Sequence, residues 1–157
     1  MKHKGALMEY FGERSDDLMR AYDEYIESCG YIRMTDVYGT IVNMPSRRFW
    51  VSDIRAALVV SAMMKGKANL KKMCPSKREM YEEIYRRVMV MYADYPDKTV
   101  SELCAMVVMQ PAPKFYLTPG SAKIMVCKAR KIRNNERKER IARFAGGIGI
   151  STKLKNG

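Results

Sequence analysis

The feature that most limits how this chain can fold is an internal repeat: two stretches of 28 residues resemble each other at an offset of 66, without a gap. Residues 34–61 align with residues 100–127. Five aligned positions are identical: Val42/Val108, Pro45/Pro111, Phe49/Phe115, Ala56/Ala122 and Val60/Val126. Repeated sequence builds the same supersecondary unit more than once. The chain is therefore expected to contain two copies of one unit.

Each copy extends upstream into a segment with apolar residues at helical spacing. The segment that begins at Asp16 resembles the one that begins at Arg78, at an offset of 62. The difference from 66 is explained by a longer connector in the second copy, residues 92–100. In both segments the apolar residues lie on one helical face: Leu18, Tyr22, Tyr25 and Ile26, then Met80, Ile84, Val88 and Met91. Each unit is predicted to be helix, loop, helix, proline–aromatic loop, helix.

Local signals mark where the second and third helices end and begin. Pro45 and Pro111 stop the second helices, because proline donates no backbone hydrogen bond and disfavours helix in the residue before it. Helix starts are marked by a hydroxyl residue followed by an acid or a proline: Thr35–Asp36, Ser101–Glu102, Ser52–Asp53 and Thr118–Pro119. The alternative of strands at 47–52 and 114–118 is weak, because these segments are too short and isolated to make a sheet.

The predicted fold is all-α: two tandem tri-helical repeats packed together, then an extended basic C-terminal helix and a flexible, glycine-rich tail. The expected divisions are an N-terminal arm (1–13), a first repeat (14–75), a second repeat (76–133) and the basic extension with its tail (134–157). The 157 residues are 47% hydrophobic and 29% charged, which is typical of a globular protein. No apolar run reaches the roughly 20 residues that span a bilayer, and the start lacks a secretory signal, so a cytoplasmic location is expected.

Residues that perform catalysis or bind metals are scarce. The one histidine, His3, lies near the terminus, and histidine is the usual general base and metal ligand. Cys29, Cys74, Cys104 and Cys127 form no CxxC pair, and we expect them to be reduced and mostly buried. No phosphate-binding loop, nucleophile elbow or dinucleotide fingerprint is present. The chain is predicted not to be an enzyme, with no catalytic residues, metal, cofactor or small-molecule substrate.

Most of the net positive charge lies at the C-terminal end. The net charge is +12, and residues 128–157, with ten basic and two acidic side chains, carry +8 of it. In a helix, the cations of this segment point in several directions: Lys128, Arg130, Lys131, Arg133, Arg137, Lys138, Arg140 and Arg143. Cations that neutralise phosphates release counterions, so the segment is predicted to contact nucleic acid, DNA more than RNA. The alternatives are a solvated tail that only keeps the protein soluble, or an acidic protein surface; membrane binding ranks low, because the segment lacks a large apolar face.

The second and third helices of each unit, joined at a proline, loosely resemble a helix-turn-helix, whose later helix enters the major groove. On that interpretation Arg55 and Lys123 face DNA, and the loop cations Arg47, Arg48 and Lys114 meet phosphates. The loops, about seven residues, are longer than the usual three or four, and the third helices are mostly apolar. Sequence-specific and non-specific binding therefore both stay open.

The two aromatic pairs, Phe49–Trp50 and Phe115–Tyr116, allow two interpretations. Aromatic rings can stack on nucleic-acid bases, which makes Trp50 and Tyr116 candidate stacking residues. Alternatively, one ring of each pair packs between the flanking helices, and we assign Phe49 and Phe115 to that role.

Three motifs carry a resemblance to a known group of proteins. Residues 44–57 (MPSRRFWVSDIRAA), 80–88 (MYEEIYRRV) and 110–123 (QPAPKFYLTPGSAK) resemble small uncharacterised basic proteins of phages and mobile elements of gut Bacteroidetes. The resemblance implies a bacterial host cell or a virion as the location, and it implies no reaction. The leading hypothesis is a nucleic-acid-binding accessory protein. The alternative is an assembly component that binds a protein partner or itself and has no nucleic-acid role.

Overall fold

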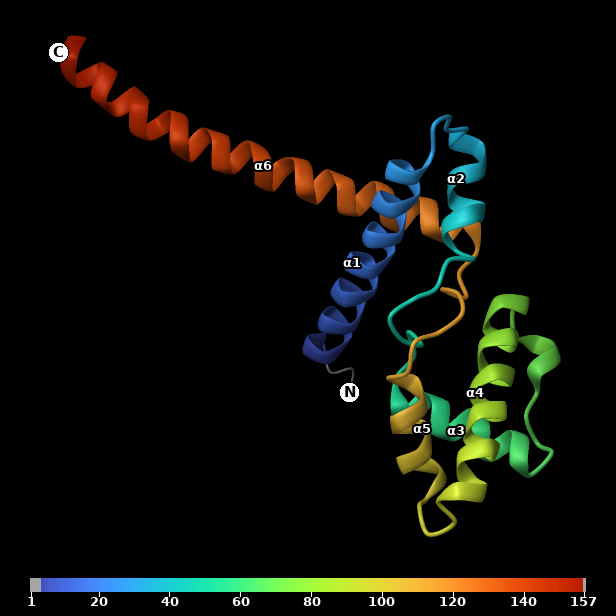
Figure 1. Ribbon diagram of the computed structural model, residues 1–157. Coiled ribbons are helices and arrows are strands. Elements are labelled where there is room, and N and C mark those ends of the chain that lie inside the picture. Colours follow the sequence, from blue (N-terminus) through green and yellow to red (C-terminus); the bar gives the residue numbers. More distant parts are fainter. Residues whose placement is uncertain (1–3, 157) are drawn as a thin grey trace.

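The computed structural model describes the backbone of residues 4–156 and the side chains of residues 11–146. Over this range the chain is all-helical, as predicted, and has no strand (Figure 1). The helices in chain order are α1 (Lys4–Ser28), α2 (Met34–Ile41), α3 (Asp53–Met64), the short 3-10 helix η1 (Leu70–Lys72), α4 (Pro75–Asp94), α5 (Val100–Val108) and α6 (Pro119–Asn156). The expected N-terminal arm is part of α1 from Lys4 onward, and residues 1–3 lie outside the described chain.

Side-chain caps fix the starts of α3 and α5. The Ser52 hydroxyl accepts a hydrogen bond from the third amide of α3, as its sequence position predicted. At α5 the prediction of Ser101 was two residues late. Thr99 is the cap, because Thr99 and Glu102 each accept a bond from the other's backbone amide, at 3.2 and 3.0 Å, which satisfies two otherwise unpaired donors. The prediction of Thr35 as a cap was also wrong, since Thr35 lies inside α2.

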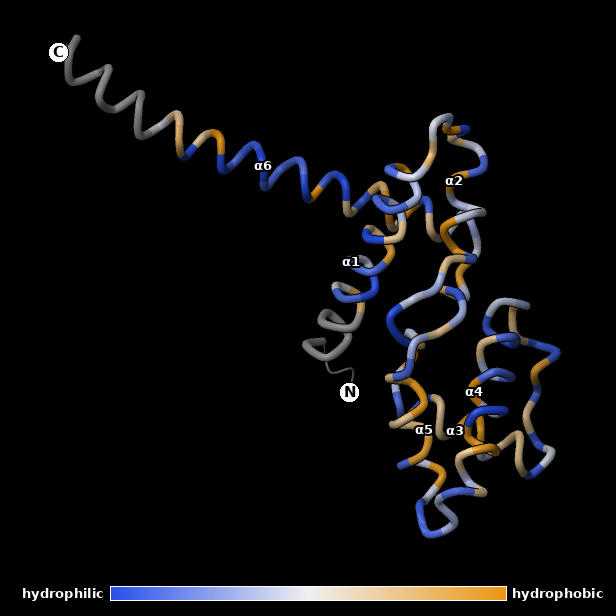
Figure 2. Tube along the Cα trace, in the orientation of Figure 1, coloured by the Kyte–Doolittle hydropathy of each residue, from blue (hydrophilic) through white to orange (hydrophobic). Residues whose placement is uncertain are grey.

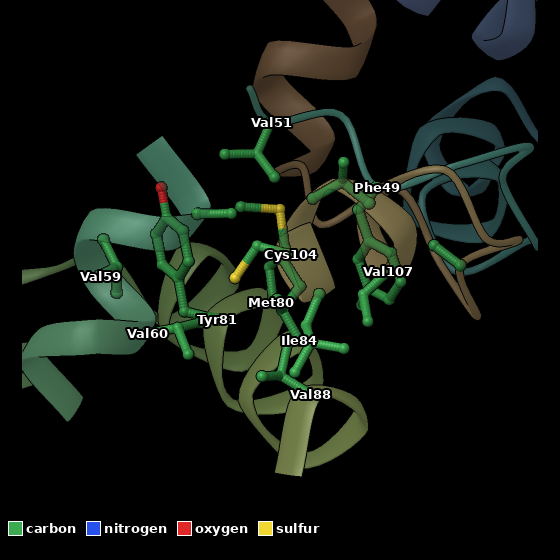
Figure 3. Packing of buried hydrophobic residues seen from close by; sticks show 14 of the residues in the cluster. Phe49, Val51, Val59, Val60, Met80, Tyr81, Ile84, Val88, Cys104 and Val107 are labelled. Atoms are coloured by element: carbon green, nitrogen blue, oxygen red, sulfur yellow. The ribbon is translucent and has the colours of Figure 1, made fainter. Parts of the chain in front are cut away.

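Two separate hydrophobic clusters define two bodies. In the first, α3 packs against α4 and α5, around fully buried side chains such as Ile84, Val88 and Val107 (Figure 3). In the second, the start of α6 packs against α1 and α2, around Leu18 and Ile41. We call these the α3–α4–α5 body and the α1–α2–α6 body. Each body takes its third helix from the other half of the chain.

The segments that carry the third helices across, residues 42–52 and 108–118, run antiparallel to each other between the bodies (Figure 1). Ser46 and Ala112 exchange two backbone hydrogen bonds, both 3.0 Å long. The amides of Phe49 and Phe115 each donate to a carbonyl of the opposite connector, at 3.0 and 2.9 Å. Ser46 and Ala112 stand 66 residues apart, so the bonded positions are those that the sequence repeat aligns.

The connectors divide each aromatic pair between the two bodies, so that the two rings of a pair lie in different hydrophobic clusters. Phe49 and Tyr116 pack together in the α3–α4–α5 body, with their rings stacked 5.9 Å apart. Trp50 and Phe115 pack in the α1–α2–α6 body. The assignment of Phe49 and Phe115 to the core is therefore confirmed, and both of their neighbours are buried as well.

The last helix leaves the body soon after it begins. Ala122 and Val126 of α6 are buried against α1 and α2, whereas every residue from 130 to 146 is exposed. Beyond them the backbone stays helical to Asn156, where the sequence predicted a flexible tail. Glycine weakens a helix by about 1 kcal/mol per residue but does not break it as proline does, and no proline occurs after Pro119. Within residues 4–156, no helix combines the length and hydropathy needed to cross a bilayer.

Candidate nucleic-acid interface

Among the residues predicted to bind nucleic acid, most of the cations lie on the exposed part of α6. Residues 128–146 carry eight cations and two carboxylates, and most of this stretch is hydrophilic (Figure 2). Two of the cations have carboxylate partners: Arg133 bonds Asp23 at 3.1 Å, and Arg143 lies 3.7 Å from Glu139. The other six make no ion pair with any residue of the described chain: Lys128, Arg130, Lys131, Arg137, Lys138 and Arg140.

Where α6 crosses α1, its cations have local partners. Arg133 donates two hydrogen bonds to Asp23, which raise the pKa of the guanidinium. Arg130 lies 5.7 Å above the ring of Tyr22. Lys128 lines a hollow between the two helices, together with four carboxylates of α1: Asp16, Asp23, Glu24 and Glu27. The cations after residue 133 are therefore the ones most available to an external anion.

Each of the three loop cations, Arg47, Arg48 and Lys114, has a partner within the protein. Arg48 donates to two carbonyls of its own connector, each at 3.1 Å. Lys114 pairs with Glu79. The Arg47 guanidinium lies 3.6 Å from the buried Asp17 carboxylate, although most of its side chain is exposed. Of the three, Arg47 is the most exposed, and none belongs to the α6 surface.

The remaining predicted cations lie in different bodies. Arg55 is exposed on the first turn of α3, and Lys123 is exposed on the first turns of α6. In a helix-turn-helix two successive helices pack on each other, but α3 packs against α4 and α5, and α6 packs against α1 and α2. The arrangement differs from the expected module because the connectors carry α3 away from α2, and α6 away from α5.

Trp50 and Tyr116, the candidate stacking residues, are only 9% exposed. The Trp50 indole donates a 3.1 Å hydrogen bond to Asp17, and burial raises the pKa of Tyr116 to about 12. Tyr116 also has a φ of 56°, a left-handed conformation that is uncommon outside glycine. Both rings are core residues in this structure, so their burial does not support base stacking.

A second basic segment was missed by the sequence reasoning. Residues 65–78 contain six cations and no acid: Lys65, Lys67, Lys71, Lys72, Lys77 and Arg78. The five lysines are exposed, and none of the six makes an ion pair within the described chain. When charges are summed over a long stretch such as residues 1–75, the acidic side chains of α1 offset these cations and the segment is not noticed. A window of about a dozen residues would have found it.

The cysteines differ in exposure. Cys104 is buried, which raises the pKa of its thiol to about 11. Cys74 and Cys127 are exposed and Cys29 is half-buried, so the prediction that most of them are buried was wrong. Among the described residues, no cluster of three or more histidine, cysteine or acidic side chains is placed to hold a metal ion.

Comparison with known proteins assigns neither a family nor an activity. No protein-family model, curated protein or solved structure matches the chain significantly. A function is therefore inferred from the residues and contacts described above.

Proposed function

We propose that this protein is a non-enzymatic accessory protein of a phage or mobile element that binds the phosphate backbone of nucleic acid, duplex DNA in particular, through α6. The observation that carries the proposal is the exposure of residues 130–146, with cations that have no carboxylate partner. A single helix without a packed face is only marginally stable in water. Bound nucleic acid would give these cations negatively charged partners, and the counterions released from its phosphates would favour binding.

The size of the surface sets the expected salt dependence. At about 1.5 Å per residue, residues 128–143 span about 24 Å. The eight cations point around the helix, so about four of them reach one duplex at a time. Four phosphate contacts give a slope of log K against log salt of about −3.6. Contacts of this kind position a protein on the duplex without reading its sequence.

The test is binding to labelled duplex DNA, single-stranded DNA and RNA over a series of salt concentrations. The triple variant R137Q/K138Q/R140Q is expected to flatten the salt slope by about 1 to 3 units, since each lost phosphate contact removes about 0.9. Deletion of residues 134–157 is expected to flatten it further. Full-length protein that binds none of the three nucleic acids at low salt contradicts the proposal.

A matched control removes the same charge from other parts of the surface. Arg33, Arg86 and Lys98 lie on or beside α2, α4 and α5, away from the projecting part of α6. The variant R33Q/R86Q/K98Q lowers the net charge by the same three units. If it weakens binding as much as the α6 variant does, net charge alone drives association and α6 is not the binding surface.

Exposed apolar side chains favour the second candidate function, assembly with a protein partner. Ile141 and Phe144 on α6 are 58% and 74% exposed, and Ile54 and Leu58 on α3 are similarly exposed. Contiguous exposed apolar side chains often mark a protein-interaction surface. Sedimentation equilibrium of the full chain and of a chain without residues 134–157 tests this candidate. A monomer in both cases, at high protein concentration, removes the support for self-assembly.

For the fold, we infer that the two copies of the repeat exchange their third helices within one chain, as a domain-swapped dimer does between two chains. Contacts recur at aligned positions: Arg48 lies 5.2 Å above the Trp50 ring, and Lys114 lies 5.5 Å from the Tyr116 ring. Two surface hollows are lined by aligned residues, all 66 apart: Glu13/Glu79, Arg48/Lys114, Trp50/Tyr116, Val51/Leu117, Asp53/Pro119, Ala105/Gly39, Val108/Val42 and Met109/Asn43. One chain would then have the approximate two-fold symmetry of a dimer.

A further inference from the structure

The basic segment between α3 and α4 aligns with the basic extension of α6. At the same offset of 66, residues 65–77 fall on residues 131–143. Every lysine of the first segment meets a cation in the second: Lys65/Lys131, Lys67/Arg133, Lys71/Arg137, Lys72/Lys138 and Lys77/Arg143. Asn69 and Asn135 are identical as well. The repeat therefore continues beyond its apolar part into the charges.

The two segments display the same charges in different conformations. Residues 131–143 continue α6 as a projecting helix. Residues 65–77 instead turn away from α3 at Gly66, include the 3-10 helix η1 and lead into α4. The five aligned lysines are exposed in this second setting too, so the change of backbone conformation has not buried them.

The two segments also lie on different sides of the molecule. The extension of α6 leaves from the α1–α2–α6 body, whereas the segment between α3 and α4 lies on the far side of the α3–α4–α5 body (Figure 1). Cations placed so far apart, with a folded body between them, are poorly placed to serve one short duplex together.

We propose that Lys65, Lys67, Lys71, Lys72 and Lys77 form a second phosphate-binding surface, so that one protein molecule bridges two segments of duplex DNA. The inference rests on the proposed function of α6. It adds that the chain has two surfaces, one from each copy of the repeat, each capable of binding on its own. A protein of this kind joins or compacts nucleic acid, beyond coating a single duplex.

The experiment is a bridging assay in which a duplex fixed on beads captures a second, fluorescent duplex through the protein. K71Q/K72Q and R137Q/K138Q form a matched pair, because they remove the same charge at aligned and exposed positions. Each variant is expected to lose most bridging while it still binds a single duplex through the intact surface. In single-duplex binding, loss of two phosphate contacts would change the salt slope of the altered surface by about 1.8 units. Circular dichroism of both variants serves as the control for folding.

The outcomes separate this inference from the proposed function. If K71Q/K72Q bridges as well as the unaltered protein while R137Q/K138Q does not, the second surface is refuted and the role of α6 stands. If the unaltered protein binds a single duplex but captures no second one, bridging is refuted. If it binds no duplex at all, the proposed function fails. If both double variants still bind a single duplex and each loses bridging, the result supports two separate binding surfaces.

Discussion

Replacing Asp17 by asparagine tests how the α1–α2–α6 body is joined to the connector between α2 and α3. The Asp17 carboxylate is completely buried. Its Oδ2 accepts hydrogen bonds from the Trp50 indole at 3.1 Å and from the Arg47 amide at 2.8 Å. Its Oδ1 accepts from the Arg20 guanidinium at 2.9 Å. One side chain thus satisfies three donors from two segments.

The expected loss of stability follows from these contacts. Asparagine has the same shape but only one acceptor oxygen, so whichever way the amide turns, at least one donor faces an NH2 group. A buried donor without a partner costs about 1 to 3 kcal/mol. Breaking a buried ion pair costs about 3 to 5 kcal/mol, but Arg20 is partly exposed and keeps bonds to Glu24 and to a carbonyl, which places the loss near the lower end. We expect D17N to lower the free energy of unfolding by about 3 kcal/mol.

The assay is urea unfolding followed by fluorescence and by circular dichroism. Trp50 is the only tryptophan, so its fluorescence reports directly on this site. D23N is the matched control, because Asp23 pairs with Arg133 on the exposed surface and such pairs contribute less than about 1 kcal/mol. A D17N protein within about 0.5 kcal/mol of the unaltered one would refute the reasoning, because that is the scatter of ordinary surface substitutions.

Three further predictions follow from single contacts. T99A removes the side-chain cap of α5 and is expected to cost about 1 kcal/mol in urea unfolding, with no loss expected if the cap is dispensable. A thiol reagent is expected to modify Cys74 rapidly and Cys104 only on unfolding, because Cys104 is buried with a pKa of about 11; equal rates would contradict this. Burial raises the pKa of Tyr116 to about 12, whereas in the unfolded chain the phenol ionises near pH 10. The contribution of the neutral phenol to the free energy of unfolding is therefore complete below pH 10 and is lost as the pH rises from about 10 to 12. Comparison of unfolding with Y116F across that range isolates the effect.

Two helix ends and one helix cap were predicted correctly, because each is encoded by a short stretch of sequence. Pro45 and Pro111 end their helices within a few residues of the predicted places, and Ser52 caps α3. The burial of Phe49 and Phe115 follows from their position between two apolar helices. The burial of Asp17 had no comparable signal, because aspartate is rarely buried and its partners, Arg47 and Trp50, are distant in sequence.

The packing of α3 on α4 and α5, and of α6 on α1 and α2, was not readable from the sequence, for a physical reason. The buried residues Ala56 and Val60 of α3 align with the buried residues Ala122 and Val126 of α6, so the apolar pattern does not tell which helix belongs to which body. The backbone hydrogen bonds between the two connectors depend on the path of the chain and not on side-chain identity, so the sequence pattern does not reveal them. On the inferred exchange, the first helices align at an offset of 66, which places Glu13 with Glu79. The sequence alone favoured an offset of 62 for these helices, because an alignment of apolar residues takes no account of which residues they contact in the fold.

One position explains why the two copies display their charges differently. Gly66 has a φ of 68°, and the amide of Lys67 bonds back to the carbonyl of Ala62, an arrangement that closes the end of α3. The aligned residue in the second copy is Ile132, whose branched side chain disfavours that left-handed conformation. The helix therefore continues there and carries its cations outward, whereas in the first copy the chain turns back to begin α4. Gly66 thus accounts for the different paths that the two aligned basic segments take after α3 and within α6.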